Sequence, residues 1–277
     1  MLKRILLLLA ETESSTAARD YAFKLAQEAG AEVAGLAGID LSSIAVRMPG
    51  GVGVATFKAK LEEELKAKAA QTRQTLRSAF ERQCRDRNIA CEWLSFEGEP
   101  ADTLHLGAET CDLLLSGYDT AFRGEIFESP SEMASKLLLM SPRPAIICPN
   151  RLSGSDGIFV AYDGSVPAMR ALQMFALLGL GTGRRIQVAS IDDDRNVAAR
   201  RADAAAKYLR SHGLDVSADP IATGVHPAEV LKIEIAQRKI GTLVMGAYGR
   251  RGLREMLFGS TTNTIIEEPP CTVFLYH

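Results

Sequence analysis

The strongest constraint on the fold is an internal repeat, because the same order of segments occurs twice along the chain. Each copy opens on a short apolar run, Ile5–Leu9 or Ile158–Tyr162, followed by small and polar residues and a helical stretch. Each copy closes on a proline pair and another apolar run, at residues 142–147 and 269–274. Ordered correspondences of this kind indicate a repeated structural unit, so the 277-residue chain is predicted to hold two tandem domains.

Short apolar strands alternate with helical segments in both copies, a pattern that favours a parallel sheet with helices on both faces. The runs at 113–115 and 243–245 are continuously apolar, which is typical of strands that are covered on both sides. We therefore predict an α/β fold of two tandem doubly wound parallel five-stranded sheets. One sheet is expected in residues 1–150 and the other in residues 156–277, with a short polar linker between them.

The first copy differs from the second by an insertion at residues 40–56 that contains several glycines. A long charged helix is predicted to follow, over roughly residues 57–88. The second copy has only a shorter segment at this place, residues 194–212.

Composition excludes several classes of function. The net charge is −2, without the basic excess that a phosphate-backbone binder needs, so no nucleic-acid partner is expected. The apolar run Ile5–Ala10 is too short for a membrane span or a signal peptide. Five cysteines without a C-x-x-C pair predict reduced thiols in a cytoplasmic protein. The four histidines lack metal-ligand spacing, so no metal site is predicted.

The most informative motif is a glycine-containing segment that follows the apolar run at 242–245. Gly246 and Gly249 precede a second cluster, Gly259–Thr261, which opens a helical stretch. Ligands of doubly wound sheets bind outside the carboxyl ends of the strands, where glycines let backbone amides approach and a helix start attracts phosphate. With Arg250 adding positive charge, the segment predicts a phosphate cradle. The alternative is a surface loop whose glycines are structural. The segment is neither a Walker A loop nor a G-x-G-x-x-G fingerprint.

Asp163 is the second candidate, because it ends the first apolar run of its half beside the expected switch point of the sheet. A carboxylate at this position can bond a ribose hydroxyl or an adenine amino group. The alternative role is to cap the following helix, for which Ser165 is an equally good candidate.

The spacing Gly-x2-Gly-x9-Gly-Ser, together with Val-Ala-Tyr-Asp-Gly-Ser at the first strand of the second half, resembles the universal stress protein family in its tandem two-domain form. The motifs are strong in residues 157–277 and weak in residues 1–150. The resemblance implies a Rossmann-like fold of the adenine nucleotide alpha hydrolase type, binding of ATP, ADP or AMP, and a role in stress responses. It also implies contact with the second strand's backbone at about Ser190. The candidate nucleotide-binding residues are Ala161, Tyr162, Asp163, Ser190, Met245, Gly246, Gly249, Arg250, Gly259, Ser260, Thr261 and Thr262.

The first half departs from that pattern. Ala10 stands at the position of the nucleoside carboxylate, and Ser116 and Asp119 replace the two spaced glycines. Asp119 and Glu125 would repel a phosphate. We expect a degenerate first site that binds nothing, or a ligand other than a triphosphate.

Three functions follow as hypotheses. The leading one is a cytoplasmic regulatory protein whose second domain binds ATP or another adenine nucleotide. The second is a slow ATPase or phosphotransferase, with His226 as a weak candidate base; no catalytic residue is predicted and the enzyme hypothesis is the less favoured one. The third is a scaffold for a protein partner, with a vestigial loop. A divalent metal beside the phosphates is an open alternative, but no acidic cluster in the second loop indicates one.

The resemblance also implies a partner for each half, because members of this family commonly pair through their last strands. The two halves are therefore expected to dock as an intramolecular pseudo-dimer, with residues 145–148 near 272–276. A homodimer of whole chains is a further alternative, and no membrane partner is expected.

Overall fold

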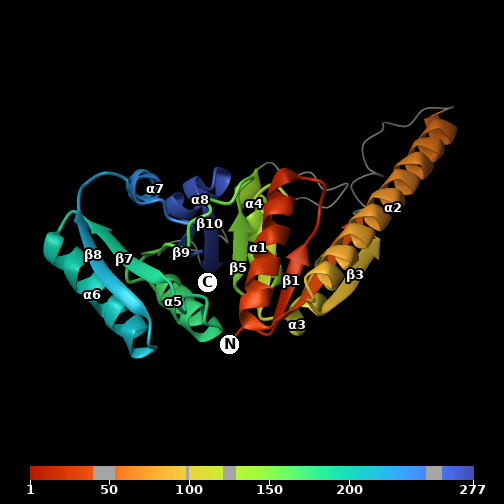
Figure 1. Ribbon diagram of the computed structural model, residues 1–277. Helices are drawn as coiled ribbons and strands as arrows, with labels where there is room; N and C mark the ends of the chain where they lie inside the picture. Colours follow the sequence, from red (N-terminus) through yellow and green to blue (C-terminus); the bar gives the residue numbers. More distant parts are fainter. Residues whose placement is uncertain (40–53, 98–99, 121–128, 248–257) are drawn as a thin grey trace.

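The computed structural model describes residues 1–39, 54–97, 100–120, 129–247 and 258–277 (Figure 1). The first half contains β1 (Arg4–Leu8), α1 (Glu13–Ala29), β2 (Glu32–Ile39), α2 (Val54–Asp86), β3 (Cys91–Glu97), α3 (Pro100–Glu109), β4 (Leu113–Gly117), α4 (Pro130–Met140) and β5 (Ala145–Cys148). The second half contains β6 (Ile158–Ala161), α5 (Val166–Leu178), β7 (Arg185–Asp192), α6 (Arg195–Ser211), β8 (Asp215–Ala222), α7 (Pro227–Arg238), β9 (Thr242–Gly246), α8 (Ser260–Glu267) and β10 (Thr272–Tyr276). The predicted α/β alternation is confirmed in both halves.

All the strands join one ten-stranded sheet in the order β3-β2-β1-β4-β5-β10-β9-β6-β7-β8. The strands within each half are parallel, as predicted. The two halves meet where β5 and β10 pair antiparallel, with Ile146 opposite Phe274. The expected neighbourhood of residues 145–148 and 272–276 is therefore confirmed, and the two five-stranded sheets form one continuous mixed sheet.

Helices cover both faces of this sheet (Figure 1). Successive side chains of a strand point to opposite faces, so Leu7 joins one buried cluster and Leu8 the other. Buried residues of α1, α2, α5 and α6 belong to the first cluster, and those of α3, α4, α7 and α8 belong to the second. Each cluster runs through both halves, so the apolar core is shared between them.

Local signals explain where the helices begin and end. Thr12 and Ser165 are the N-caps of α1 and α5, and each side chain accepts a backbone N–H of the first turn. Gly30 and Gly179 end the same helices in the left-handed conformation that glycine adopts without a steric cost. The long helix of the first half, α2, begins and ends within three residues of the predicted bounds.

Side chains reinforce the junction between the halves. The Tyr21 hydroxyl on α1 lies 3.0 Å from the Thr242 hydroxyl on β9, and this hydrogen bond is buried. The Arg184 guanidinium pairs with Glu28 at 2.5 Å. Among the described residues, none of the helices combines the length and the apolar character needed to cross a bilayer.

Candidate functional site

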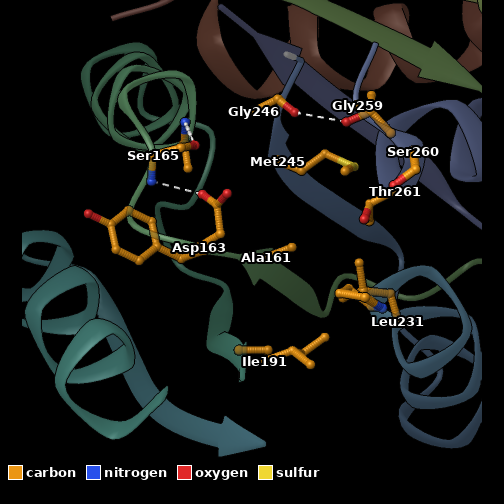
Figure 2. Close-up of a pocket in the computed structure, with 15 residues that line it drawn as sticks. Ala161, Asp163, Ser165, Ile191, Leu231, Met245, Gly246, Gly259, Ser260 and Thr261 are labelled. Atoms are coloured by element: carbon orange, nitrogen blue, oxygen red, sulfur yellow. Dashed lines mark hydrogen bonds between the residues drawn. The ribbon is translucent and has the colours of Figure 1, made fainter. Parts of the chain in front are cut away.

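A cavity of about 230 Å³ opens at the switch point of the second half, where β6 and β9 are neighbours but their following helices lie on opposite faces (Figure 2). This is the place where ligands bind in doubly wound sheets. The lining residues are Ala161, Tyr162, Asp163, Ser165, Ala168, Ala189, Ile191, Pro227, Leu231, Met245, Gly246, Gly259, Ser260, Thr261 and Thr262.

One part of the cavity is an apolar slot. Its floor is formed by Ala161 of β6 and Ala189 of β7, which are paired neighbours in the sheet. Ile191 and Leu231 also line the cavity near this floor, and Met245 comes from β9 (Figure 2). Two alanines next to each other leave space above the sheet, and the surrounding side chains are apolar. The slot therefore fits a flat ring.

Asp163 lines the polar edge of this slot, two residues after the end of β6. Its Oδ1 accepts the backbone N–H of Ser165 at 2.9 Å, which fixes the turn before α5. Ser165, not Asp163, is the N-cap, since its hydroxyl accepts the N–H of Ala168 at 3.3 Å. The turn thus holds the Asp163 carboxylate at the cavity, where its second oxygen accepts no hydrogen bond from the described part of the chain.

The opposite end of the cavity is the start of α8. Gly259 is the N-cap and has no side chain to accept a first-turn N–H. Ser260, Thr261 and Thr262 follow it and line the cavity. The Thr262 hydroxyl donates to the Gly246 carbonyl at 3.2 Å, which ties the helix start to the end of β9 (Figure 2). A helix start without a side-chain cap offers free N–H donors and a partial positive charge, so this end of the cavity attracts an anion.

Most of the candidate residues from the sequence come together at this cavity. Ala161, Tyr162, Asp163, Met245, Gly246, Gly259, Ser260, Thr261 and Thr262 all line it. Gly249 and Arg250 lie outside the described residues, so their placement stays a prediction. Ser190 is completely buried in β7 but is absent from the lining.

The position of Ser190 follows from strand alternation. Val188 belongs to the cluster under α5 and α6, so Ser190, two residues later, faces the same side. Its neighbours Ala189 and Ile191 face the cavity instead. The Ser190 hydroxyl has no hydrogen-bond partner within the described structure. Side-chain parity in β7 was the signal that could have found the two neighbours from sequence.

Burial raises the pKa of the Tyr162 phenol, and the nearby Asp163 carboxylate raises it further. Tyr162 is therefore neutral at pH 7 and contributes an uncharged wall. Within the described ranges, no group of three or more histidine, cysteine, aspartate or glutamate residues is arranged to hold a metal ion.

The end of β9 shows why Gly246 is a glycine. A Cβ at this position would lie 2.7 Å from the backbone nitrogen of Ala168. The end of β4 has the same relationship, since a Cβ on Gly117 would lie 2.6 Å from the nitrogen of Ser15. Gly117 is therefore the counterpart of Gly246, and the expected correspondence with Ser116 is wrong by one residue. Both glycines admit the start of a neighbouring helix, a packing requirement that the two halves share.

The first half fills the space that the second half leaves open. Leu8 and Leu36 are paired neighbours in β1 and β2, as Ala161 and Ala189 are in β6 and β7. The two leucines are 1% and 0% exposed and pack in one cluster with Phe96 of β3, which is 6% exposed. Larger side chains thus occupy the place of the apolar slot.

An internal carboxylate also occupies the anion position of the first half. The helix equivalent to α8 is α4, and the Glu267 carboxylate accepts hydrogen bonds from both the backbone N–H and the hydroxyl of Ser131 in its first turn. Glu267 comes from the second half of the chain. A negative side chain at this helix start competes with any external anion.

The first half has a cavity of its own, but on the other face of the sheet. It measures about 190 Å³ and lies between the ends of β1 and β2 and the helix α2. Arg73 lines it and pairs with Glu97 at 2.7 Å, while Thr72 donates to Glu11 at 3.3 Å. The charged lining residues Arg73 and Glu11 thus both have partners within the first half.

Known proteins resemble this chain in sequence and in fold. Residues 155–277 match the model of the universal stress protein family. Universal stress protein Slr1230 of Synechocystis is 22% identical over 145 residues, which are 51% of this chain and 49% of that protein. This chain therefore matches about half the length of that relative.

Two solved structures share the fold over nearly the full length. A universal stress protein from Archaeoglobus fulgidus is 21% identical, with a TM-score of 0.66 over 99% of this chain and 97% of that chain. A protein of unknown function from Pseudomonas aeruginosa is 17% identical, with a TM-score of 0.57 over 99% and 92%. Both likenesses concern the fold.

Proposed function

We propose that this chain, whose residues 155–277 match the model of the universal stress protein family, binds an adenine nucleotide in the cavity of its second half. We further propose that it acts in the cytoplasm as a regulatory protein of the stress response. The observation that carries the binding proposal is the joining, in one cavity, of an apolar slot, a carboxylate and an uncapped helix start.

The three parts of the cavity suit the three parts of a nucleotide. The slot over Ala161 and Ala189 would take the adenine ring, because it is flat, apolar and bounded by aliphatic side chains. The second oxygen of Asp163 would accept a hydrogen bond from a ribose hydroxyl. The start of α8, with Ser260 and Thr261, would bind the phosphates through N–H groups and hydroxyls. Gly249 and Arg250 would complete this cradle.

The first half is proposed to bind no nucleotide. Leu8, Leu36 and Phe96 stand in the adenine position, Ala10 replaces the ribose carboxylate, and Glu267 takes the anion position. The first half would then serve as the packing partner of the second half.

A universal stress protein from Archaeoglobus fulgidus has been solved in complex with dAMP. The likeness to this chain is 20% identity with a TM-score of 0.36, and nothing about this chain's ligand follows from it.

Isothermal titration of the purified protein with ATP, ADP, AMP and GTP tests the proposal. We expect saturable heat with the adenylates and a loss of at least tenfold in affinity in Asp163→Asn, which keeps an acceptor for the Ser165 N–H but loses the charge. Absence of heat at high micromolar adenylate, with a folded protein, would contradict the proposal and favour the scaffold. Mass spectrometry of nucleotide that co-purifies from cells is an independent check.

A further inference from the structure

His226 stands at the phosphate end of the cavity without being part of its lining. It is the N-cap of α7, is exposed, and directly precedes the lining residue Pro227. Its Nε2 lies 3.3 Å from the Oγ of Ser260, the first residue of α8. The two side chains therefore join the starts of α7 and α8 across the edge of the cavity.

The protonation of the neutral ring follows from its other contact. The backbone N–H of Ala228 donates to Nδ1 at 3.3 Å, so Nδ1 must present a lone pair. In neutral imidazole the proton is then on Nε2. Nε2–H consequently donates to the Ser260 hydroxyl oxygen, which acts as the acceptor in this pair.

This arrangement determines what the Ser260 hydroxyl can do. Because the Ser260 hydroxyl accepts a hydrogen bond from His226 and does not donate to it, its own proton is available to donate elsewhere. Ser260 lines the cavity beside the uncapped helix start (Figure 2). An anionic oxygen bound at that start would be within the region that this O–H can reach. A ring that donates through Nε2 has no lone pair there, so it does not serve as a general base toward Ser260.

We infer that His226 is a positioning residue for phosphate binding: its Nε2–H holds the Ser260 hydroxyl so that the O–H donates to a phosphate oxygen of the bound nucleotide. The inference rests on the proposed function. It adds to the phosphate site one residue, His226, that lies outside the glycine motif. It also predicts a division of the site, since the His226–Ser260 pair lies at the phosphate end and Ala161 and Ala189 at the ring end.

The test compares ADP with adenosine as titrants of three variants. His226→Asn keeps a side chain that caps a helix well but is too short to bridge to Ser260, so it separates capping from positioning. His226→Asn and Ser260→Ala are each expected to weaken ADP binding by about tenfold, the range for one hydrogen bond to a charged group. Both should leave adenosine affinity unchanged.

The double variant should lose no more ADP affinity than either single variant, because the two residues act as a unit. His212→Ala, at the end of α6, is the matched control and should bind like wild type.

A second readout does not depend on the ligand. Nitrogen-15 NMR of the histidine ring in the ligand-free protein should show His226 protonated on Nε2. A ring protonated on Nδ1 overturns the inference whatever the affinities are. Unchanged ADP affinity in His226→Asn, with wild type binding ADP, also overturns the inference and leaves the proposed function intact. A wild-type protein that binds no adenylate overturns the proposed function and the inference together.

Discussion

Ala189 in β7 and Leu36 in β2 hold equivalent positions in the two halves. Each is paired with the last residue of the first strand of its half. The partner of Ala189 is Ala161, and the partner of Leu36 is Leu8. The same backbone register therefore yields an open slot in one half and a filled core in the other. Larger side chains at these two positions, together with Phe96, fill in the first half the space that is open in the second.

Replacing Ala189 by leucine should close the slot. We expect Ala189→Leu to reduce adenylate affinity by at least a hundredfold, while overpacking costs about 1–3 kcal/mol of the free energy of unfolding. Titration calorimetry and denaturant unfolding measure the two effects. Ala204→Leu on the exposed side of α6 is the control and should change neither. Wild-type affinity in a folded Ala189→Leu protein would show that the ligand does not use the slot.

The glycines at the strand ends should be needed for packing. In Gly246→Ala and Gly117→Ala the new Cβ lies within 3 Å of backbone atoms at the start of a helix, so the helix or the strand must move. We expect each variant to lose about 2 kcal/mol or more of unfolding free energy. Gly224→Ala is the control, since a Cβ there meets nothing within 4 Å, and it should stay near wild type in the same chemical-denaturation series. A stable Gly117→Ala protein would argue against the assigned equivalence with Gly246.

The bond between Tyr21 and Thr242 should stabilise the junction of the halves in a pH-dependent way. Tyr21→Phe removes a buried hydrogen bond and is expected to cost about 1 kcal/mol at pH 8. Burial raises the pKa of Tyr21 above its ordinary value of 10.0, so the native state favours the neutral phenol. This contribution is complete below pH 10 and is lost as the pH rises from 10 toward the native pKa, because the unfolded state ionises first.

Urea unfolding of wild type and Tyr21→Phe at pH 8 and at pH 11 checks this prediction. The stability difference between the two proteins should shrink at the higher pH. Tyr208→Phe, on the half-buried side of α6, is the control. A difference that grows with pH would contradict the assigned direction of the pKa shift.

The Glu267 carboxylate should stabilise α4 across the junction. Glu267→Ala leaves the first turn of α4 without its charged acceptor, and we expect a loss of about 1–2 kcal/mol in the free energy of unfolding. Glu268→Ala is the neighbouring control, because its side chain is 91% exposed and its ion pair with Lys232 is long, at 3.8 Å. Equal stability of the two variants would show that the Glu267 carboxylate does not stabilise the first turn of α4.

The sequence was sufficient to predict the architecture because its signals are local. Apolar runs such as 113–115 and 243–245, the helical stretches between them and the repeated proline pairs each depend on near neighbours in the chain. The glycine segment and Asp163 could be placed at the strand ends for the same reason. The one-residue error at Ser116 concerns the register of the strand end, which neighbouring strands and helices fix.

By itself the sequence determined that two α/β units follow each other, and it predicted a phosphate site in the second. Only the tertiary structure decided that the two sheets join through β5 and β10, that Ala161 lies beside Ala189, and that Glu267 reaches the start of α4. These relationships connect segments far apart in the chain. They depend on the volumes and directions of side chains after folding, which periodicity and spacing along the chain do not record.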